Sequence, residues 1–142
     1  MGWRARYALP ALRLLLAKSS VQFPHIATPI LGQFSARDVL LDKDVFEDGS
    51  VIVLRTPGHT PGHSSLLVKL PQTGAVVLSG DAMHFRENYD AFGVPAFNYD
   101  RAQTVASMER IKKIASNLKA TIIIQHDARD VEKLPAYPAS AK

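Results

Sequence analysis

Residues 56–65 read TPGHTPGHSS, and this run decides the fold of the chain. It places two histidines, two prolines and two glycines between two strand-like segments, SVIVLR at 50–55 and LLVKL at 66–70. Proline presets φ and glycine tolerates positive φ, so such a run favours a tight turn. We therefore predict a rigid loop that presents His59 and His63 at the ends of two strands, where catalytic residues are commonly found.

Apolar segments on both sides of this loop predict a single sheet. The predicted strands are residues 38–41, 45–46, 51–54, 65–70, 75–79 and 120–125. Residues 47–50 predict a type I′ hairpin turn, because Asp-Gly accepts its two positive φ angles. A second turn is predicted at 71–74. The run at 75–79 is almost continuously apolar, which indicates a strand buried on both faces.

The last third of the chain predicts a strand, a loop, a helix and a strand. Residues 84–99 are rich in aromatic and charged side chains and are predicted to form a long loop. Asp100 and Gln103 fit a capping box at the start of a helix. One buried stripe of that helix is predicted from the spacing of Ile111, Ile114, Ala115 and Leu118. The fold class is α+β, layered as α/β in its last part, with one mixed sheet under helical cover.

Length and composition limit the function classes. The chain has 142 residues, which suits one domain, and it has no cysteine, so histidines and carboxylates are the strong metal ligands available. Five basic residues precede the first acidic residue, Asp38, and account for more than the whole net charge of +4. A basic excess confined to one end argues against nucleic-acid binding, which needs a basic face.

Residues 1–20 form a basic, acid-free segment that we set apart from the rest, 21–142. Three interpretations stay open: an organellar targeting peptide, a surface helix, or sequence left over from an upstream break. The apolar run at 11–17 contains Arg13 and is too short to span a membrane. We predict a cytoplasmic protein without a membrane span, with an organellar location as the alternative.

Three predicted strands end close to a candidate metal ligand. These ligands are His59, Asp81 and His126. Each has an ordinary structural explanation when taken alone, but side chains at neighbouring strand ends converge on ligand sites. Two imidazoles and a carboxylate suit zinc or a similar divalent ion. A carboxylate between two histidines can bridge two ions, which would activate water and polarise a carbonyl or phosphoryl oxygen.

These motifs resemble the second half of the metallo-β-lactamase superfamily, and within it the N-acyl-homoserine lactonase branch. Asp81 follows His59 by 22 residues, and His126 follows Asp81 by 45, as in that superfamily. The likeness covers residues from about 38 to 135. The stretches that carry it are TPGHTPGHS at 56–64, SGD at 79–81, DVFEDGS at 44–50 and GDAMHFRE at 80–87.

The resemblance implies a fold and a set of roles. The fold would be the C-terminal half of an αββα sandwich, so residues 21–142 would form a partial domain. His59 would be a ligand of a first zinc ion and His126 of a second, with Asp81 bridging them. His63 would support the loop from outside the direct metal contacts. The branch has a tyrosine three residues beyond the bridging aspartate. Here His84 stands at that position and would assist catalysis at the substrate carbonyl or the leaving oxygen, and Asp81 would take part in catalysis by helping to hold both ions.

One element of the superfamily is missing from this chain. The signature His-x-His-x-Asp-His does not occur among its five histidines, and His25 is predicted to be a loop residue. Two protein ligands would remain for each ion, against three in the usual catalytic zinc site, so we expect weak or partial zinc binding.

The predicted function is therefore hydrolysis of a small lactone or related ester by metal-activated water, impaired by the missing ligands. Two alternatives stay open. One is a truncated, non-catalytic remnant. The other is an interaction module whose exposed apolar sheet face binds a partner or a second copy in a homodimer.

Overall fold

The computed structural model describes residues 41–136 and 139–142. The predictions for residues 1–40, including the basic segment and His25, lie outside this range. The strands are β1 (Lys43–Asp44), β2 (Val51–Arg55), β3 (Ser64–Leu70), β4 (Gly74–Leu78) and β5 (Thr121–Ile123). The helices are η2 (Gly80–Ala82), α3 (Arg86–Ala91), α4 (Arg101–Leu118) and α5 (Ala128–Val131).

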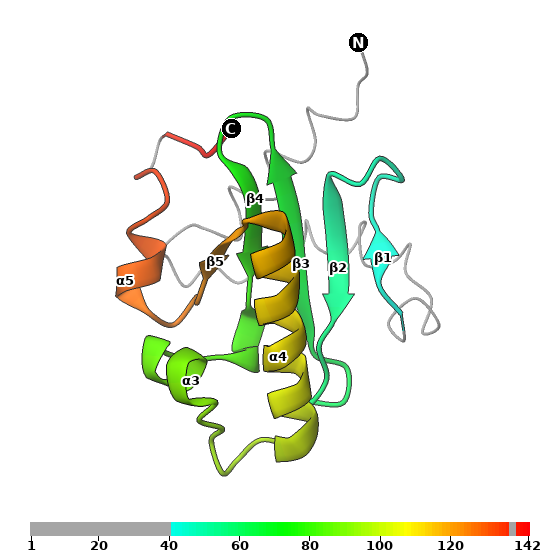
Figure 1. Ribbon diagram of the computed structural model, residues 1–142, viewed down its shortest axis with the longest axis vertical. Coiled ribbons are helices and arrows are strands. Elements are labelled where there is room, and N and C mark those ends of the chain that lie inside the picture. The colour runs from blue at the N-terminus through cyan, green and yellow to red at the C-terminus, as the bar shows by residue number, and fades with distance from the viewer. Residues whose placement is uncertain (1–40, 137–138) are drawn as a thin grey trace, which may run out of the picture.

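The strands form one mixed sheet in the order β1-β2-β3-β4-β5. Strands β1 to β4 pair antiparallel with their neighbours, whereas β4 and β5 pair in parallel, with Leu78 opposite Ile123. The chain passes from β4 to β5 through α4, which lies across one face of the sheet (Figure 1). Strands β2, β4 and β5 therefore run in the same direction and end at one edge. This confirms the predicted fold class.

The sheet is buried on both faces. Val77 packs under α4 with Met108 and Ile111, and all three side chains are fully buried. The neighbours of Val77 along β4 point the other way, as side chains alternate along a strand. These neighbours, Val76 and Leu78, bury the opposite face together with Val68 of β3 and Ile123 of β5, and each of the four is at most 3% exposed. The strand predicted to be buried on both faces is thus confirmed. The prediction of an exposed apolar face is wrong for these four residues, and homodimerisation stays a prediction.

Helix α4 begins at its predicted cap. The carboxylate of Asp100 accepts a hydrogen bond from the Gln103 amide N–H at 2.9 Å. The Gln103 side chain bonds to the same carboxylate, not to the backbone as the capping box predicts. Ile111 and Ala115 are buried as predicted. Leu118 is 42% exposed, so its place in the buried stripe is wrong; it lies in the last turn of the helix.

The segment predicted as a long loop contains the short helix α3. Its sequence, RENYDA, has no apolar stripe, so periodicity gives no sign of a helix. Tertiary contacts hold it instead. The ammonium group of Lys112 in α4 lies 4.3 Å from the ring centre of Tyr89 and 3.8 Å from that of Phe92. Such cation–π contacts attach α3 to α4.

The connection from β1 to β2 is longer than the predicted two-residue turn. Strand β1 lies just before the predicted strand at 45–46, and the Asp44 carboxylate accepts from the amide N–H of Gly49 at 2.6 Å. Positive φ angles occur at Glu47 and Gly49, which are not adjacent, so the turn is not type I′. The turn predicted at 71–74 is confirmed between β3 and β4.

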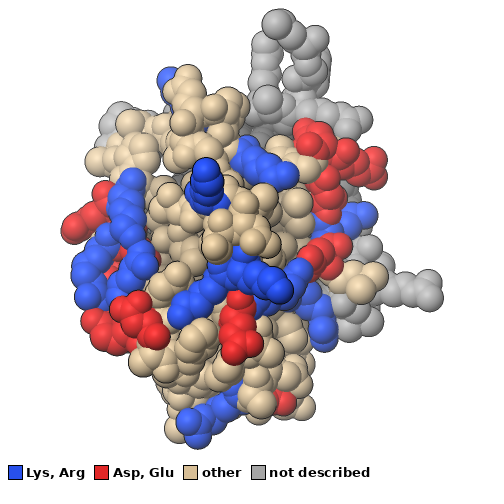
Figure 2. All heavy atoms as spheres, in the orientation of Figure 1, with Lys and Arg blue, Asp and Glu red and all other residues tan. Residues whose placement is uncertain are grey.

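Charged side chains tie the helices to one another. Figure 2 shows lysine and arginine side chains gathered with acidic ones on the face that α4 covers. Arg86, Lys112, Lys119 and Lys133 line a hollow of about 400 Å³ there. Arg86 and Lys133 both pair with the buried carboxylate of Asp130, so part of this charge serves packing. In the described part of the chain, no helix combines the length and apolar character needed to cross a membrane.

Candidate metal centre

The predicted ligands meet at the edge where β2, β4 and β5 end. His59 lies in the loop between β2 and β3, Asp81 lies in η2 directly after β4, and His126 follows β5. His84 follows η2 and joins the same group, while His63 lies just before β3. The sheet topology thus brings together residues that are far apart in the sequence (Figure 1).

The loop that carries His59 is fixed to the start of α4. The carbonyl of Gly58 accepts from the Asp100 amide N–H at 2.8 Å, and the carbonyl of Pro57 accepts from the Ser107 hydroxyl at 2.7 Å. Gly58 has φ +134°, and a Cβ there would lie 2.3 Å from the backbone nitrogen of Thr104. Only glycine fits this contact, so the Pro-Gly-His sequence sets where the imidazole stands.

His63 supports the backbone of Asp81. Its Nε2 accepts from the Asp81 amide N–H at 2.8 Å, so the ring proton is on Nδ1, which lies 2.7 Å from the Thr56 carbonyl oxygen. Burial lowers the pKa of His63, although the carbonyl contact and Asp81 act in the opposite direction. A neutral imidazole is the form that this pair of bonds requires. These bonds connect His63 to the backbone of Thr56 and of Asp81, and the role of His63 at a metal site stays a prediction.

His59 is oriented by a residue that the sequence analysis missed. Its Nδ1 lies 3.2 Å from Oδ1 of Asn98, whose side-chain amide donates to the Thr104 hydroxyl at 3.1 Å. Because the Asn98 oxygen accepts, Nδ1 carries a proton, and in the neutral tautomer of the ring Nε2 presents a lone pair. That Nε2 lies 3.4 Å from Oδ2 of Asp81. Asn98 is 39 positions from His59 in an aromatic segment, and no motif marks it.

In that neutral tautomer, two acceptors face each other across 3.4 Å. A cation between them would satisfy both, so this pair fits a metal ion. Ligating histidines typically donate their other ring N–H to an oxygen, as His59 does to Asn98.

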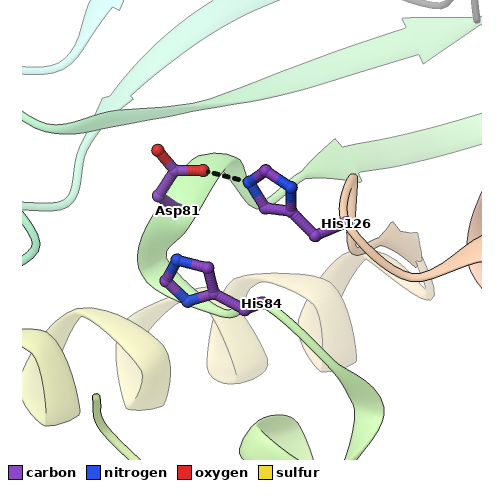
Figure 3. Close-up of side chains that lie close together, drawn as sticks. All are labelled: Asp81, His84 and His126. Atoms are coloured by element: carbon purple, nitrogen blue, oxygen red, sulfur yellow. Dashed lines mark hydrogen bonds and ion pairs between the residues drawn. The ribbon is translucent and has the colours of Figure 1, made fainter.

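On its other side, Asp81 meets two histidines. Nε2 of His126 lies 2.7 Å from Oδ1 of Asp81. The rings of His84 and His126 stack with centroids 5.3 Å apart and an interplanar angle of 15°. One candidate ligand atom each from Asp81, His84 and His126 lies within 4.8 Å of the other two. Figure 3 shows both rings beside the carboxylate, with the dashed bond joining Asp81 to His126.

The charges of the site suit metal binding. Burial raises the pKa of Asp81, but the hydrogen bond and charge of His126 and the charges of His59 and His84 outweigh burial, so the pKa is lowered. Burial lowers the pKa of His84, and Asp81 only partly opposes this. Carboxylate and neutral imidazole are the forms that bind metals. The side chains of Asp81 and His126 are 42% and 52% exposed, which leaves the group open to a ligand.

An aromatic side chain lies beside these residues. Phe97 is 72% exposed, and its ring centre lies 6.0 Å from that of His59 and 5.7 Å from that of His84, both edge to face. An exposed ring of this size next to polar ligands forms an apolar side of the site.

The chain belongs to the metallo-beta-lactamase superfamily, whose family model matches residues 3–126. The predicted resemblance to its N-acyl homoserine lactonase branch is confirmed by the relatives that follow.

The chain is similar to an N-acyl homoserine lactonase, AttM, of Azorhizobium caulinodans, with 32% identity over 108 residues, 74% of this chain and 41% of the relative. It is also similar to AiiA of Bacillus thuringiensis subsp. kurstaki, with 34% identity over 88 residues, 62% of this chain and 35% of the relative.

A solved N-acyl homoserine lactone hydrolase, with the product N-hexanoyl-L-homoserine bound at its catalytic metal centre, superposes with a TM-score of 0.62 and 32% identity. That match covers 70% of this chain and 39% of that one. The chain therefore spans about 40% of the length of these relatives.

Proposed function

We propose that this chain is a metal-dependent hydrolase that opens a lactone or a related ester of a small molecule. The observation that carries the proposal is the position of Asp81 between His59 and the His84–His126 pair, at the edge where three strands end. The relatives named as N-acyl homoserine lactonases support the substrate class. Hydrolysis adds one water molecule across the ester C–O bond and yields a carboxylate, a hydroxyl group and a proton.

The residues of the site would divide this work. His59, Asp81 and His126 would hold zinc, and Asp81 would face two ions with its two oxygens. A bound zinc ion supplies a Lewis acid that lowers the pKa of water and polarises a carbonyl. His63 would keep Asp81 in place through the backbone bond described above. The predicted action of His84 at the substrate carbonyl stays a prediction.

The apolar side of the site indicates what else the substrate carries. Phe97 presents an exposed ring next to His59 and His84. An acyl chain would cover this ring and remove apolar surface from water. We therefore propose an acylated lactone over a compact, polar one.

The experiment measures zinc and turnover together. The purified chain is dialysed, its zinc is measured by elemental analysis, and hydrolysis of N-hexanoyl homoserine lactone is followed by proton release with and without added zinc. We expect added zinc to restore turnover that dialysis removes, because the predicted binding is weak. Asp81→Asn should lower turnover by at least about 100-fold, more than the loss of a supporting residue.

The matched control is Asp90→Asn, which changes an exposed aspartate of α3 outside the site. Turnover of this variant should equal that of the unchanged chain. Less than one equivalent of zinc together with no turnover at any zinc concentration would contradict the proposal. Equal loss in both variants would show that the change at Asp81 acts through charge or folding.

A further inference from the structure

The two oxygens of Asp81 have unequal surroundings. Oδ2 faces one histidine, His59, at 3.4 Å. Oδ1 lies 2.7 Å from Nε2 of His126. The His84 ring lies at similar distances from both other rings, 5.3 Å from the centre of His126 and 5.5 Å from that of His59. The ligand atoms that lie within 4.8 Å of one another nevertheless come from Asp81, His84 and His126. A catalytic zinc site normally has three protein ligands and one open position. Asp81, His84 and His126 form such a set of three, whereas His59 is not part of this group in the described part of the chain.

The backbone of His84 is fixed by buried neighbours, and no hydrogen bond occupies Nδ1 of its ring in the described part of the structure. The residue before it, Met83, is fully buried, and so is most of Ala82. These two buried residues fix the position of the backbone from which the His84 side chain extends. Its Nδ1 is buried and has no hydrogen-bond partner in the described part of the structure. The ring thus has no hydrogen bond through this atom that would account for its position, and Figure 3 shows it turned towards Asp81 and His126.

The distances suit a single ion. Ligand atoms around a tetrahedral zinc with bonds of about 2.0 Å lie about 3.3 Å apart. The three candidate atoms lie within 4.8 Å of each other, so small rotations of exposed or half-exposed side chains close the difference. His126 is 52% exposed and can make such a rotation at little packing cost.

We propose that His84 is a metal ligand and completes, with Asp81 and His126, a site for one divalent cation such as zinc. The resemblance to the lactonases assigns no ligand at this position, where that branch has a tyrosine. The third ligand offsets part of what the absent His-x-His-x-Asp-His signature would supply. This inference rests on the proposed function only for the choice of zinc as the ion. It predicts that the first equivalent of metal binds more tightly than a second one at His59.

Cobalt(II) reports this site without any need for turnover. The metal-free chain is titrated with Co²⁺, and binding is followed by visible absorption and by equilibrium dialysis with Zn²⁺ as competitor. His84→Phe keeps a flat ring that can stack on His126 but removes both nitrogens. We expect it to lower the affinity for the first equivalent at least tenfold. The tenfold figure is a lower bound, because residues that only support a ligand already change metal affinity by about tenfold when they are lost. The matched variant His59→Phe should change the affinity for the first equivalent less than about threefold.

The opposite result overturns the inference. If His84→Phe binds the first equivalent as the unchanged chain does, or if His59→Phe loses it equally, then His84 is not the third ligand. An action of His84 on the substrate carbonyl alone would leave metal binding intact and lower turnover. Circular dichroism of the metal-free variants checks that each is folded.

A second measurement covers the case in which His84→Phe does not fold. X-ray absorption at the cobalt edge counts imidazoles in the His59→Phe variant. Two imidazoles support the proposal, and one contradicts it. These measurements test the metal site separately from the proposed hydrolase activity. If the chain binds cobalt through His84 but does not open lactones, the metal site stands and the hydrolase proposal fails. If the chain opens lactones but His84→Phe binds cobalt as the unchanged chain does, only the role of His84 as a ligand is contradicted.

Discussion

Gly58 lets the loop that carries His59 lie close against α4. Its positive φ and its contact with Thr104 leave no space for a side chain. We predict that Gly58→Ala lowers the free energy of unfolding by about 3 kcal/mol, from backbone strain and from the clash. Gly74→Ala is the matched change, because Gly74 also has positive φ but nothing lies within 4 Å of its added Cβ. Strain alone should cost about 1 kcal/mol there.

Urea denaturation of both variants measures the difference. Equal losses at the two glycines would mean that the contact with Thr104 yields easily, and that the loop is less rigid than the structure indicates.

Among single residues, the sequence motif was sufficient to select the candidate ligands but not every side chain around them. His59, Asp81 and His126 could be selected as candidates because each follows an apolar run and has the spacing of a family, and their role as ligands stays a prediction. Asn98 could not, because its contact with His59 exists only after the loop folds onto α4. The approach of His84 to His126 also depends on tertiary structure, since these rings meet across η2 and the end of β5.

Among the elements, α5 fastens the end of β5 to α3. Asp130 in α5 is fully buried and accepts hydrogen bonds from the Ile124 amide at 3.0 Å, from Arg86 in α3 at 2.9 Å and from Lys133 at 2.5 Å. His126 lies between Ile124 and α5, so this junction also fixes the position of that candidate ligand. The Asp130 carboxylate thus accepts hydrogen bonds from three groups, and removing it would leave all three without this acceptor.

We predict that Asp130→Ala lowers the free energy of unfolding by about 3 kcal/mol, because it leaves a buried amide and two cations without their acceptor. Glu87→Gln removes an exposed charge that pairs with Arg129 and should change stability little. Thermal unfolding followed by circular dichroism tests both. A mild effect at Asp130 would indicate that water enters the junction and replaces the carboxylate.

The elements themselves were predictable to different degrees. Apolar runs gave β2, β3, β4 and β5, and the Asp100 cap gave the start of α4, since burial and capping leave a local pattern. Helix α3 was missed because contacts with distant residues, among them Lys112 and Asp130, hold it rather than an apolar pattern of its own. The length of the β1–β2 turn was missed because the Asp44 side chain closes it from outside the Asp-Gly pair.

For the whole molecule, stability should fall steadily as the solution is acidified. Burial lowers the pKa of His63 and of His84, so unfolding takes up protons below about pH 6.5. The pKa of Asp127 is lowered by its bonds with Arg129 and Arg86. Burial raises the pKa of Asp130, but its bonds with Lys133, Arg86 and the Ile124 amide outweigh burial and lower it.

Acidification lowers the free energy of unfolding both in the pH range where the histidines titrate and in the range where the carboxylates titrate, because the unfolded chain binds more protons than the folded one. The carboxylate contribution is complete above the ordinary pKa near 4 and is lost as the pH falls through the lowered values. Urea midpoints of the metal-free chain at pH 7, 5.5, 4 and 3 should therefore decrease in order. A midpoint that rises on acidification would show that repulsion among the clustered histidines has the opposite effect to the one inferred.

The parallel pairing of β4 and β5 also bears on how the chain folds. β2 with β3, and β3 with β4, join residues through short turns, whereas Asp81 and His126 are 45 positions apart and meet only after α4 has crossed the sheet. Closing the longer loop costs more chain entropy before any contact repays it, so this pairing is expected late in folding. A cation that needs both residues would bind only chains that have finished this step. The rate of metal uptake during refolding would thus mark the end of the folding reaction.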